Sequence, residues 1–145
     1  MAEVALSASD IPYTQLPDMF PGLDRRIVTI DGLDLFMRTG GEGPPLLLLH
    51  GYPQNHVCWH RIAPELARHF SLIIPDLPGY GYSAMPPESR DHEGYSKREM
   101  AALFVKLMAA FGHQRFNVVG HDRGGACRLS HGTRSSRLRR TAFLP

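Results

Sequence analysis

The sequence predicts an α/β domain with a mostly parallel sheet that begins with an antiparallel hairpin. Three short apolar runs, residues 46–49, 71–74 and 116–119, alternate with two helix-like stretches, residues 55–69 and 97–111. Continuous apolar runs of this length are typical of parallel strands covered on both faces. Upstream of them, two β-prone segments flank Asp31-Gly32, which is a common hairpin turn.

The N-terminal part of the chain carries the hairpin. Residues 1–25 contain several prolines and little periodicity, so we expect an irregular lead-in. The domain then occupies residues 26–145. Its first two strands should run from Arg26 to Ile30 and from Leu33 to Thr39, paired at one edge of the sheet.

The two helical stretches differ in how clearly their apolar residues follow a helical pattern. Residues 55–69 place apolar side chains at near-helical spacing, and Pro64 should kink or restart that helix. From Lys97 to Phe111 the pattern is clearly amphipathic. Ser96 is the expected N-cap of this second helix, and Glu99 completes a capping box with it.

Composition indicates one ordinary globular domain of 145 residues with a formal net charge of +2. There is no charged-then-apolar leader and no run of about 18 apolar residues, so we expect a cytoplasmic protein with no membrane partner. Cys58 and Cys127 lack metal spacing and are expected to be reduced thiols. His56 and His60 lie four residues apart without a third ligand, so we interpret them as helix-surface histidines and expect no metal or other cofactor.

Arginines dominate the end of the chain. Asp122 is the last acidic residue, and six arginines follow it. Such a stretch could attract phosphate or nucleic acid. No aromatic residue lies between the arginines to stack on bases, so we expect no nucleic-acid partner.

A sharp turn follows the strand at residues 116–119. It reads Gly120-His121-Asp122-Arg123-Gly124, a G-x-D-x-G pattern. A strand-to-helix turn this sharp forces its central residue into a strained backbone conformation, and the flanking glycines let strand and helix approach. Asp122 should therefore be exposed at the carboxyl end of the sheet, where catalytic residues of open α/β sheets gather. The alternative is a plain helix N-cap, a position that Asp favours.

An aspartate at the centre of this turn suggests covalent catalysis. With an ordinary pKa of about 3.9, its carboxylate is ionised at neutral pH and can attack without help from a base. Attack on an sp³ carbon that carries a leaving group forms an alkyl ester on the enzyme. Only the hydrolysis of that ester requires a water activated by a base such as histidine. Halide displacement and epoxide opening both fit this scheme.

A second glycine-containing loop, His50-Gly51-Tyr52-Pro53-Gln54, follows the strand at residues 46–49. Gly51 permits a close approach to the turn at Asp122, and we expect His50 and Gly51 to contribute to the substrate site. The main-chain N–H groups of Tyr52 and Arg123 would form a two-donor anion site, an oxyanion hole. Taken alone, His50-Gly51 indicates only a turn.

Five segments occur in a recognisable order: residues 50–54, 59–67, 76–83, 95–98 and 120–125. Together they resemble the N-terminal half of an α/β-hydrolase, and more narrowly the haloacetate (fluoroacetate) dehalogenases, relatives of the haloalkane dehalogenases and soluble epoxide hydrolases. The resemblance covers residues 20–125 and implies a truncated α/β-hydrolase fold. It implies that Asp122 is the nucleophile and that the main chains of Tyr52 and Arg123 form the oxyanion hole. The Arg123 side chain matches an arginine that holds the substrate carboxylate, whereas epoxide hydrolases usually have tryptophan there.

The chain departs from this family after the turn. The second carboxylate-binding arginine of the family would lie at position 126, which is alanine. The family's triad continues with an acid and then a histidine, whereas residues 123–145 contain no acid and only His131. The resemblance therefore implies that the triad acid and base, and the cap domain, are absent from this chain. We expect a single alkylation of Asp122 without turnover, and a long unpaired edge on the strand at residues 116–119.

Three function classes stay open. The first is a hydrolase with an aspartate nucleophile that displaces halide from a small haloacid through an alkyl-enzyme ester, with epoxide hydrolysis as its variant. The second is another α/β-hydrolase chemistry such as ester hydrolysis, which Asp122 in place of serine disfavours. The third is a non-catalytic remnant that keeps the fold.

Overall fold

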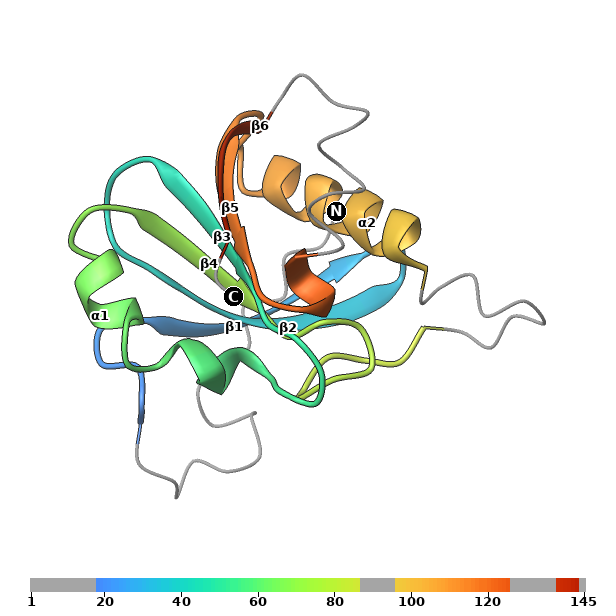
Figure 1. Cartoon of the computed structure of the whole chain (residues 1–145). Helices are drawn as coiled ribbons and strands as arrows, with labels where there is room; N and C mark the ends of the chain where they lie inside the picture. The colour runs from blue at the N-terminus through green and yellow to red at the C-terminus, as the bar shows by residue number, and fades with distance from the viewer. Residues whose placement is uncertain (1–17, 87–95, 126–137, 144–145) are drawn as a thin grey trace.

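The computed structural model describes residues 18–86, 96–125 and 138–143. Six strands form one sheet in the order β1-β2-β4-β3-β5-β6 (Figure 1). The strands are β1 (Asp24–Ile30), β2 (Leu33–Gly40), β3 (Pro45–Leu49), β4 (Ser71–Pro75), β5 (Phe116–Gly120) and β6 (Leu138–Phe143). The helical segments are the 3-10 helix η2 (His56–Trp59), α1 (Ala63–Leu66) and α2 (Lys97–Ala110).

The strand directions confirm a mostly parallel sheet with an antiparallel N-terminal hairpin. β1 pairs antiparallel with β2, and β2 pairs antiparallel with β4. The remaining neighbours, β4 with β3, β3 with β5 and β5 with β6, are all parallel. Asp31 and Gly32 have φ values of 51° and 80°, which are the left-handed angles that a two-residue hairpin turn requires.

The expectation that β5 forms an unpaired edge is wrong. β6 pairs with it in parallel and places Thr141 opposite Val118 and Phe143 opposite Gly120. A parallel crossover needs a dozen or more residues, and residues 121–137 provide that length. Residues 1–17, 87–95, 126–137 and 144–145 lie outside the described part of the chain.

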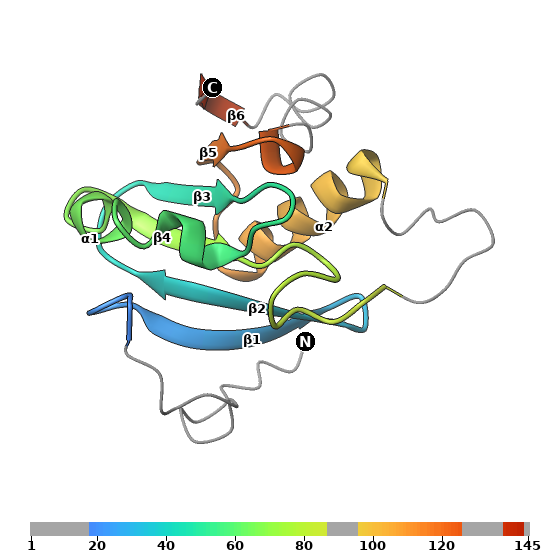
Figure 2. The ribbon, with the colours of Figure 1, turned by 60° about the horizontal axis from the view of Figure 1, so that its bottom comes forward.

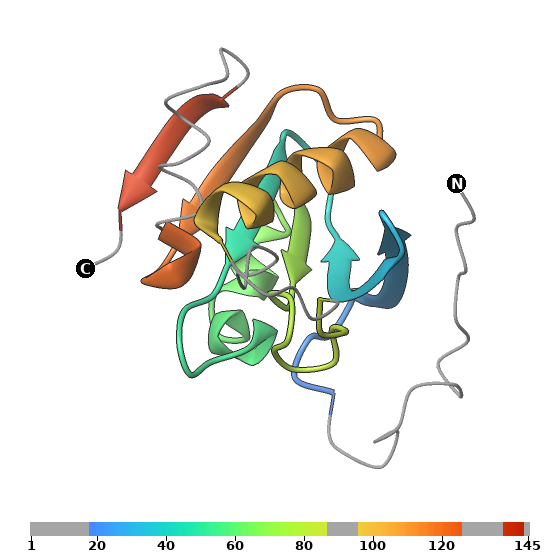
Figure 3. The ribbon, with the colours of Figure 1, turned by 90° about the vertical axis from the view of Figure 1, so that its right-hand side faces the viewer.

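Both faces of the sheet are covered, which explains the unbroken apolar run of β3. Leu47 and Leu49 belong to the core on the face that α2 crosses (Figure 3). Leu46 and Leu48 belong to the core on the opposite face. Two other groups complete the cores: Met100, Phe104, Leu107 and Met108 of α2 on the first face, and Phe20, Leu23, Trp59 and Ala63 on the second.

The helix signals are largely confirmed. Ser96 caps α2, because its hydroxyl accepts a hydrogen bond from the Glu99 N–H at 3.2 Å. η2 ends at Trp59 and α1 begins at Ala63, with Pro64 in its first turn, so the predicted helix restarts there. In the part of the chain that the structure describes, no helix is both long and apolar enough to cross a lipid bilayer.

The end of the lead-in is part of the domain. β1 begins at Asp24, two residues before the expected strand, and the side chains of Phe20 and Leu23 are buried beside Trp59. Arg38 of β2 donates hydrogen bonds to the Leu23 carbonyl and to the Asp18 carboxylate. Residues 18–23 therefore contact the sheet and its core ahead of β1. Figure 2 shows this segment reaching the start of β1.

Candidate active site

Two loops meet at the carboxyl ends of neighbouring strands. β3 and β5 are paired in parallel with Leu49 opposite Gly120, so the loops that follow them start side by side. Two main-chain hydrogen bonds join these loops: the His121 N–H donates to the Leu49 carbonyl at 3.0 Å, and the Gly124 N–H donates to the His50 carbonyl at 3.1 Å. The loops at residues 50–54 and 120–124 therefore form one compact unit.

The turn at Asp122 has the strained geometry expected from its sequence. Asp122 has φ of 48°, in the left-handed region, and its side chain is exposed. A Cβ at Gly124 would lie 2.3 Å from the Leu49 carbonyl oxygen, and a Cβ at Gly120 would lie 2.5 Å from the Gly124 carbonyl carbon. Both glycines are therefore required by the close approach of strand and helix.

Two main-chain N–H groups converge on the Asp122 carboxylate. The Tyr52 N–H donates to Oδ2 of Asp122 at 2.9 Å. This hydrogen bond, and a second one from the Arg123 N–H, hold the pKa of Asp122 below its ordinary value because they favour the ionised form. The carboxylate is therefore ionised at neutral pH and touches the two donors that the sequence singled out.

The approach of the two loops depends on Gly51. A Cβ at this position would lie 2.6 Å from Cβ of Asp122 and 3.0 Å from Oδ2. No side chain fits there without moving one of the loops. The structure thus places Gly51 directly against Asp122, through its main chain.

The side chains of Tyr52 and Arg123 lie together at the surface beside Asp122. The guanidinium carbon of Arg123 is 5.8 Å from the centroid of the Tyr52 ring, within the range of a cation–π contact. The Tyr52 residue is 64% exposed, and Arg123 is also exposed. An exposed guanidinium next to the carboxylate can meet an anionic ligand that approaches Asp122.

His50 is buried, and its ring is hydrogen-bonded to the main chain. The histidine is fully buried, with 0% of its surface exposed. Its Nδ1 atom lies 3.0 Å from the Gly51 carbonyl oxygen, and its Nε2 atom accepts a hydrogen bond from the Leu77 N–H at 2.9 Å. Burial lowers the pKa of the imidazole, so the ring is neutral. Both ring nitrogens are bonded to the main chain, and neither is left for a ligand.

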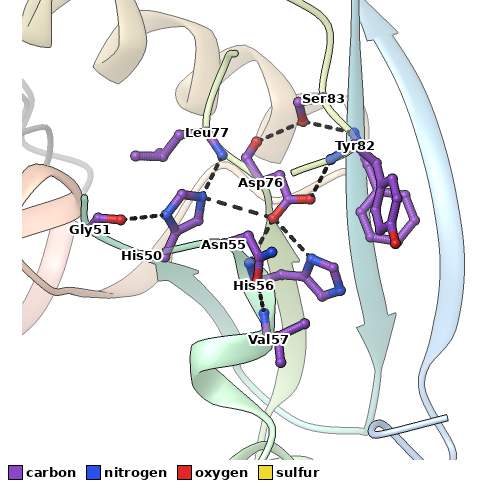
Figure 4. A network of polar contacts seen from close by, with 10 residues as sticks. His50, Gly51, Asn55, His56, Val57, Asp76, Leu77, Tyr82 and Ser83 are labelled. Atoms are coloured by element: carbon purple, nitrogen blue, oxygen red, sulfur yellow. Dashed lines mark hydrogen bonds and ion pairs between the residues drawn. The ribbon is translucent and has the colours of Figure 1, made fainter. Parts of the chain in front are cut away.

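A buried polar network below the loop was missed by the sequence reasoning. The carboxylate of Asp76, at the end of β4, is fully buried and accepts hydrogen bonds from the main-chain N–H groups of His56 and Tyr82 (Figure 4). Nδ1 of His56 also lies 2.9 Å from Oδ1 of Asp76. The available signal was an acidic residue directly after an apolar strand, opening the glycine-rich loop at residues 76–83.

His56 is therefore not a surface histidine, and that expectation is wrong. The 3-10 helix turns its ring inward to Asp76, where it also packs against Phe36 with ring centroids 4.9 Å apart. Among the described residues, no group of three or more His, Cys, Asp or Glu side chains is placed to hold a metal ion. Cys58 is a free, exposed thiol whose pKa is raised to about 11, chiefly by desolvation. Cys127 and His131 lie outside the described residues.

The fold agrees with comparisons with known proteins. Residues 44–129 match the family described as alpha/beta hydrolase fold, so the chain belongs to that family. It is 48% identical over 107 residues to a fluoroacetate dehalogenase from a Burkholderia species, an alignment that covers 74% of this chain and 35% of the relative. It is 40% identical over 97 residues to a soluble epoxide hydrolase from a Corynebacterium species, covering 67% of this chain and 32% of the relative.

Solved structures show the same arrangement. A Salmonella enterica protein assigned as an acyltransferase superimposes with a TM-score of 0.85 at 39% identity, covering 99% of this chain and 45% of that one. A Pseudomonas aeruginosa protein assigned as an epoxide hydrolase superimposes with a TM-score of 0.80 at 38% identity, covering 88% and 43%. The chain thus spans about a third of the length of the two curated relatives named above and less than half of these structures.

Proposed function

We propose that this chain carries the nucleophile of a hydrolase that displaces halide from a small haloacid. One observation carries the proposal: Asp122 is an exposed, ionised carboxylate on a strained turn, with the N–H groups of Tyr52 and Arg123 donating to it. A helix N-cap would turn its carboxylate back onto its own helix. The N–H of Tyr52, which lies 70 residues away in sequence, supports a nucleophile held by an oxyanion site instead.

The first chemical step needs no proton transfer. The carboxylate oxygen that Tyr52 does not hold attacks the carbon bearing the halogen, a carbon–oxygen bond forms, and the halide leaves with the electrons of the carbon–halogen bond. The oxygen held by Tyr52 becomes the carbonyl oxygen of the ester. The same two N–H groups are then in place to stabilise the oxyanion that develops when water attacks that ester.

Arg123 supports a substrate that carries a carboxylate. Its exposed guanidinium lies beside the nucleophile and can bind a carboxylate through two parallel hydrogen bonds. The similarity to a fluoroacetate dehalogenase supports the same substrate class. We propose epoxide opening as the second candidate, because an attacking carboxylate serves it equally well and a soluble epoxide hydrolase is a relative at 40% identity.

We infer that the 145-residue polypeptide stops at the ester. Residues 123–145 contain no acidic residue, and His131 is their sole histidine, so they offer no acid–histidine pair to activate water. A non-catalytic remnant is the third candidate, and it would not form the ester at all. Contact of His50 and Gly51 with the substrate, and the cytoplasmic location, stay predictions.

Intact-mass spectrometry after incubation with fluoroacetate or chloroacetate tests this proposal. We expect a mass increase of one carboxymethyl group, located at Asp122 by peptide mapping, with release of at most one halide per chain. Asp122→Asn is the matched control, because it keeps the side-chain size and tolerates the left-handed conformation but cannot be ionised. Labelling by an epoxide and not by a haloacid would favour the second candidate. No labelling by either probe, or labelling that persists in Asp122→Asn, would overturn the nucleophile assignment.

A further inference from the structure

The imidazole of His50 is confined to one tautomer. The Leu77 N–H can only donate, so the Nε2 atom that it contacts at 2.9 Å must be the acceptor. In a neutral ring the proton then resides on Nδ1, which lies 3.0 Å from the Gly51 carbonyl oxygen and donates to it. The ring is fully buried and burial lowers its pKa, so the neutral form prevails at neutral pH.

The carbonyl that His50 binds belongs to the same peptide unit as the oxyanion donor. In a planar trans peptide, the Gly51 C=O and the Tyr52 N–H point in opposite directions. The carbonyl accepts hydrogen bonds from Nδ1 of His50 and from the Gln54 N–H at 2.9 Å, while the N–H on the other side donates to Asp122 at 2.9 Å. Fixing the carbonyl therefore fixes the direction of the N–H, and hydrogen bonding at the carbonyl strengthens the N–H as a donor.

The segment from His50 to His56 is tied at both ends to Asp76 and Leu77, the two residues that follow β4 (Figure 4). Its first residue, His50, accepts from the N–H of Leu77. Its last residue, His56, which begins η2, donates through its main-chain N–H to the Asp76 carboxylate at 2.6 Å. A Cβ at Gly81 would lie 2.0 Å from Oδ2 of Asp76, so the loop after β4 closes tightly over this carboxylate. The segment that carries the Tyr52 N–H is thus held in place by hydrogen bonds to the residues that follow β4.

We propose that His50 is a positioning residue for the oxyanion site: held as the Nδ1–H tautomer by Leu77, it orients the Gly51–Tyr52 peptide so that the Tyr52 N–H points at Asp122. This role rests on the proposed function only in that Asp122 is taken as the nucleophile. This role differs from the direct contact with substrate that the sequence predicts for His50. It also explains why the buried imidazole has both nitrogens bonded to main-chain groups.

The first test is the ¹⁵N spectrum of the imidazole rings in the unsubstituted 145-residue chain. We expect His50 to show a protonated Nδ1 and an unprotonated Nε2 at neutral pH. A proton on Nε2, or an imidazolium at neutral pH, would overturn the proposal. This measurement decides the tautomer even where a substitution prevents folding.

Two substitutions separate positioning from general structural support. His50→Asn places an amide nitrogen where Nδ1 was and can still donate to the Gly51 carbonyl, whereas His50→Gln places its amide group near the Nε2 position and leaves that carbonyl without the bond. Both lose part of the buried ring, so comparable losses of stability in urea denaturation are expected. The readouts are the titration midpoint of the Asp122 carboxyl carbon by ¹³C NMR and the rate of carboxymethylation.

We expect His50→Gln to move the Asp122 midpoint upward and to slow carboxymethylation by about tenfold, less than the factor of about 10² that a misplacement of about 1 Å can cost. His50→Asn should retain more of the lowered midpoint and of the rate. Equal midpoints in the two variants would refute the positioning role. If the unsubstituted chain is not carboxymethylated, the proposed function fails, while the imidazole spectrum and the Asp122 midpoints still decide this inference.

Discussion

Replacing Gly51 by alanine should uncouple the two loops of the candidate site. The added Cβ would lie 2.6 Å from Cβ of Asp122, whereas carbon atoms in contact are about 3.5–4.0 Å apart. Relief of this clash moves the loops apart by about 1 Å, and the Tyr52 N···Asp122 Oδ2 distance of 2.9 Å then exceeds the usual limit of about 3.2 Å for a hydrogen bond. We therefore expect loss of the Tyr52 hydrogen bond and a rise in the pKa of Asp122.

The size of the effect follows from the same geometry. Overpacking a buried site costs about 1–3 kcal/mol of folding free energy, which corresponds to a Tm lower by roughly 3–10 °C for a chain of this length. Carboxymethylation discharges the Asp122 carboxylate, so the relevant cost is misplacement of the attacking oxygen. A shift of about 1 Å can slow a reaction about 10²-fold, and carboxymethylation should be slowed by up to that factor. Thermal denaturation and the time course of the intact mass measure the two effects separately.

Gly125→Ala is the matched control for this substitution. A Cβ at Gly125 would lie 3.4 Å from the Gly120 carbonyl oxygen, which is an ordinary contact, and the residue is three positions from Asp122. We expect this variant to be carboxymethylated at nearly the unsubstituted rate. If Gly51→Ala reacts as fast as Gly125→Ala and shows the same Asp122 midpoint, the idea that Gly51 brings the donor to the carboxylate is refuted.

Three further predictions concern ionisation and the buried network. Between neutral pH and pH 4 the rate of carboxymethylation should decline less than it would for an ordinary aspartate, which loses about 45% of its carboxylate by pH 4, because the pKa of Asp122 is lowered. A decline of about 45% or more in a chain still folded by circular dichroism would contradict this. His50 is neutral in the folded protein because its pKa is lowered, whereas in the unfolded chain it binds a proton below about pH 6.5. The free energy of unfolding should therefore fall as the pH decreases, by up to about 1.4 kcal/mol per pH unit. His50→Asn should reduce that slope in urea titrations. Asp76→Ala leaves two buried nitrogen atoms of His56 and the part-buried Tyr82 N–H without their acceptor, and should cost about 3–5 kcal/mol by the same assay. Asp76→Asn keeps an acceptor oxygen and should cost less; equal losses would show that the hydrogen bonds are not the cause.

Much of the fold could be predicted because its signals are local. The turn at Asp31-Gly32 needs two residues with positive φ, and the cap of α2 needs a hydroxyl at Ser96 three residues before an N–H. The strained turn at Asp122 is local in the same sense, since glycines on both sides in the chain make room for it. Such features depend on a few consecutive residues and can be read from them.

The failed expectations concern contacts between distant residues. Whether β5 ends the sheet depends on a strand that starts 18 residues after it, at Leu138. Whether His56 faces water depends on Asp76, 20 residues further along the chain. The histidine spacing suggested a metal pair or a helix surface, and neither interpretation could include a carboxylate brought in by the neighbouring strand.

The amino-acid sequence by itself determined the turn geometry, the cap and the strands of this protein, because hard-sphere contacts and hydrogen bonds between near neighbours decide them. It also determined that an acid stands at the centre of the G-x-D-x-G turn. Only the tertiary structure decided what that acid touches, since the Tyr52 N–H lies 70 residues away and reaches Asp122 through the pairing of β3 with β5. The orientation of that N–H is likewise tertiary, because it depends on a buried imidazole whose tautomer is set by Leu77 of the adjacent loop.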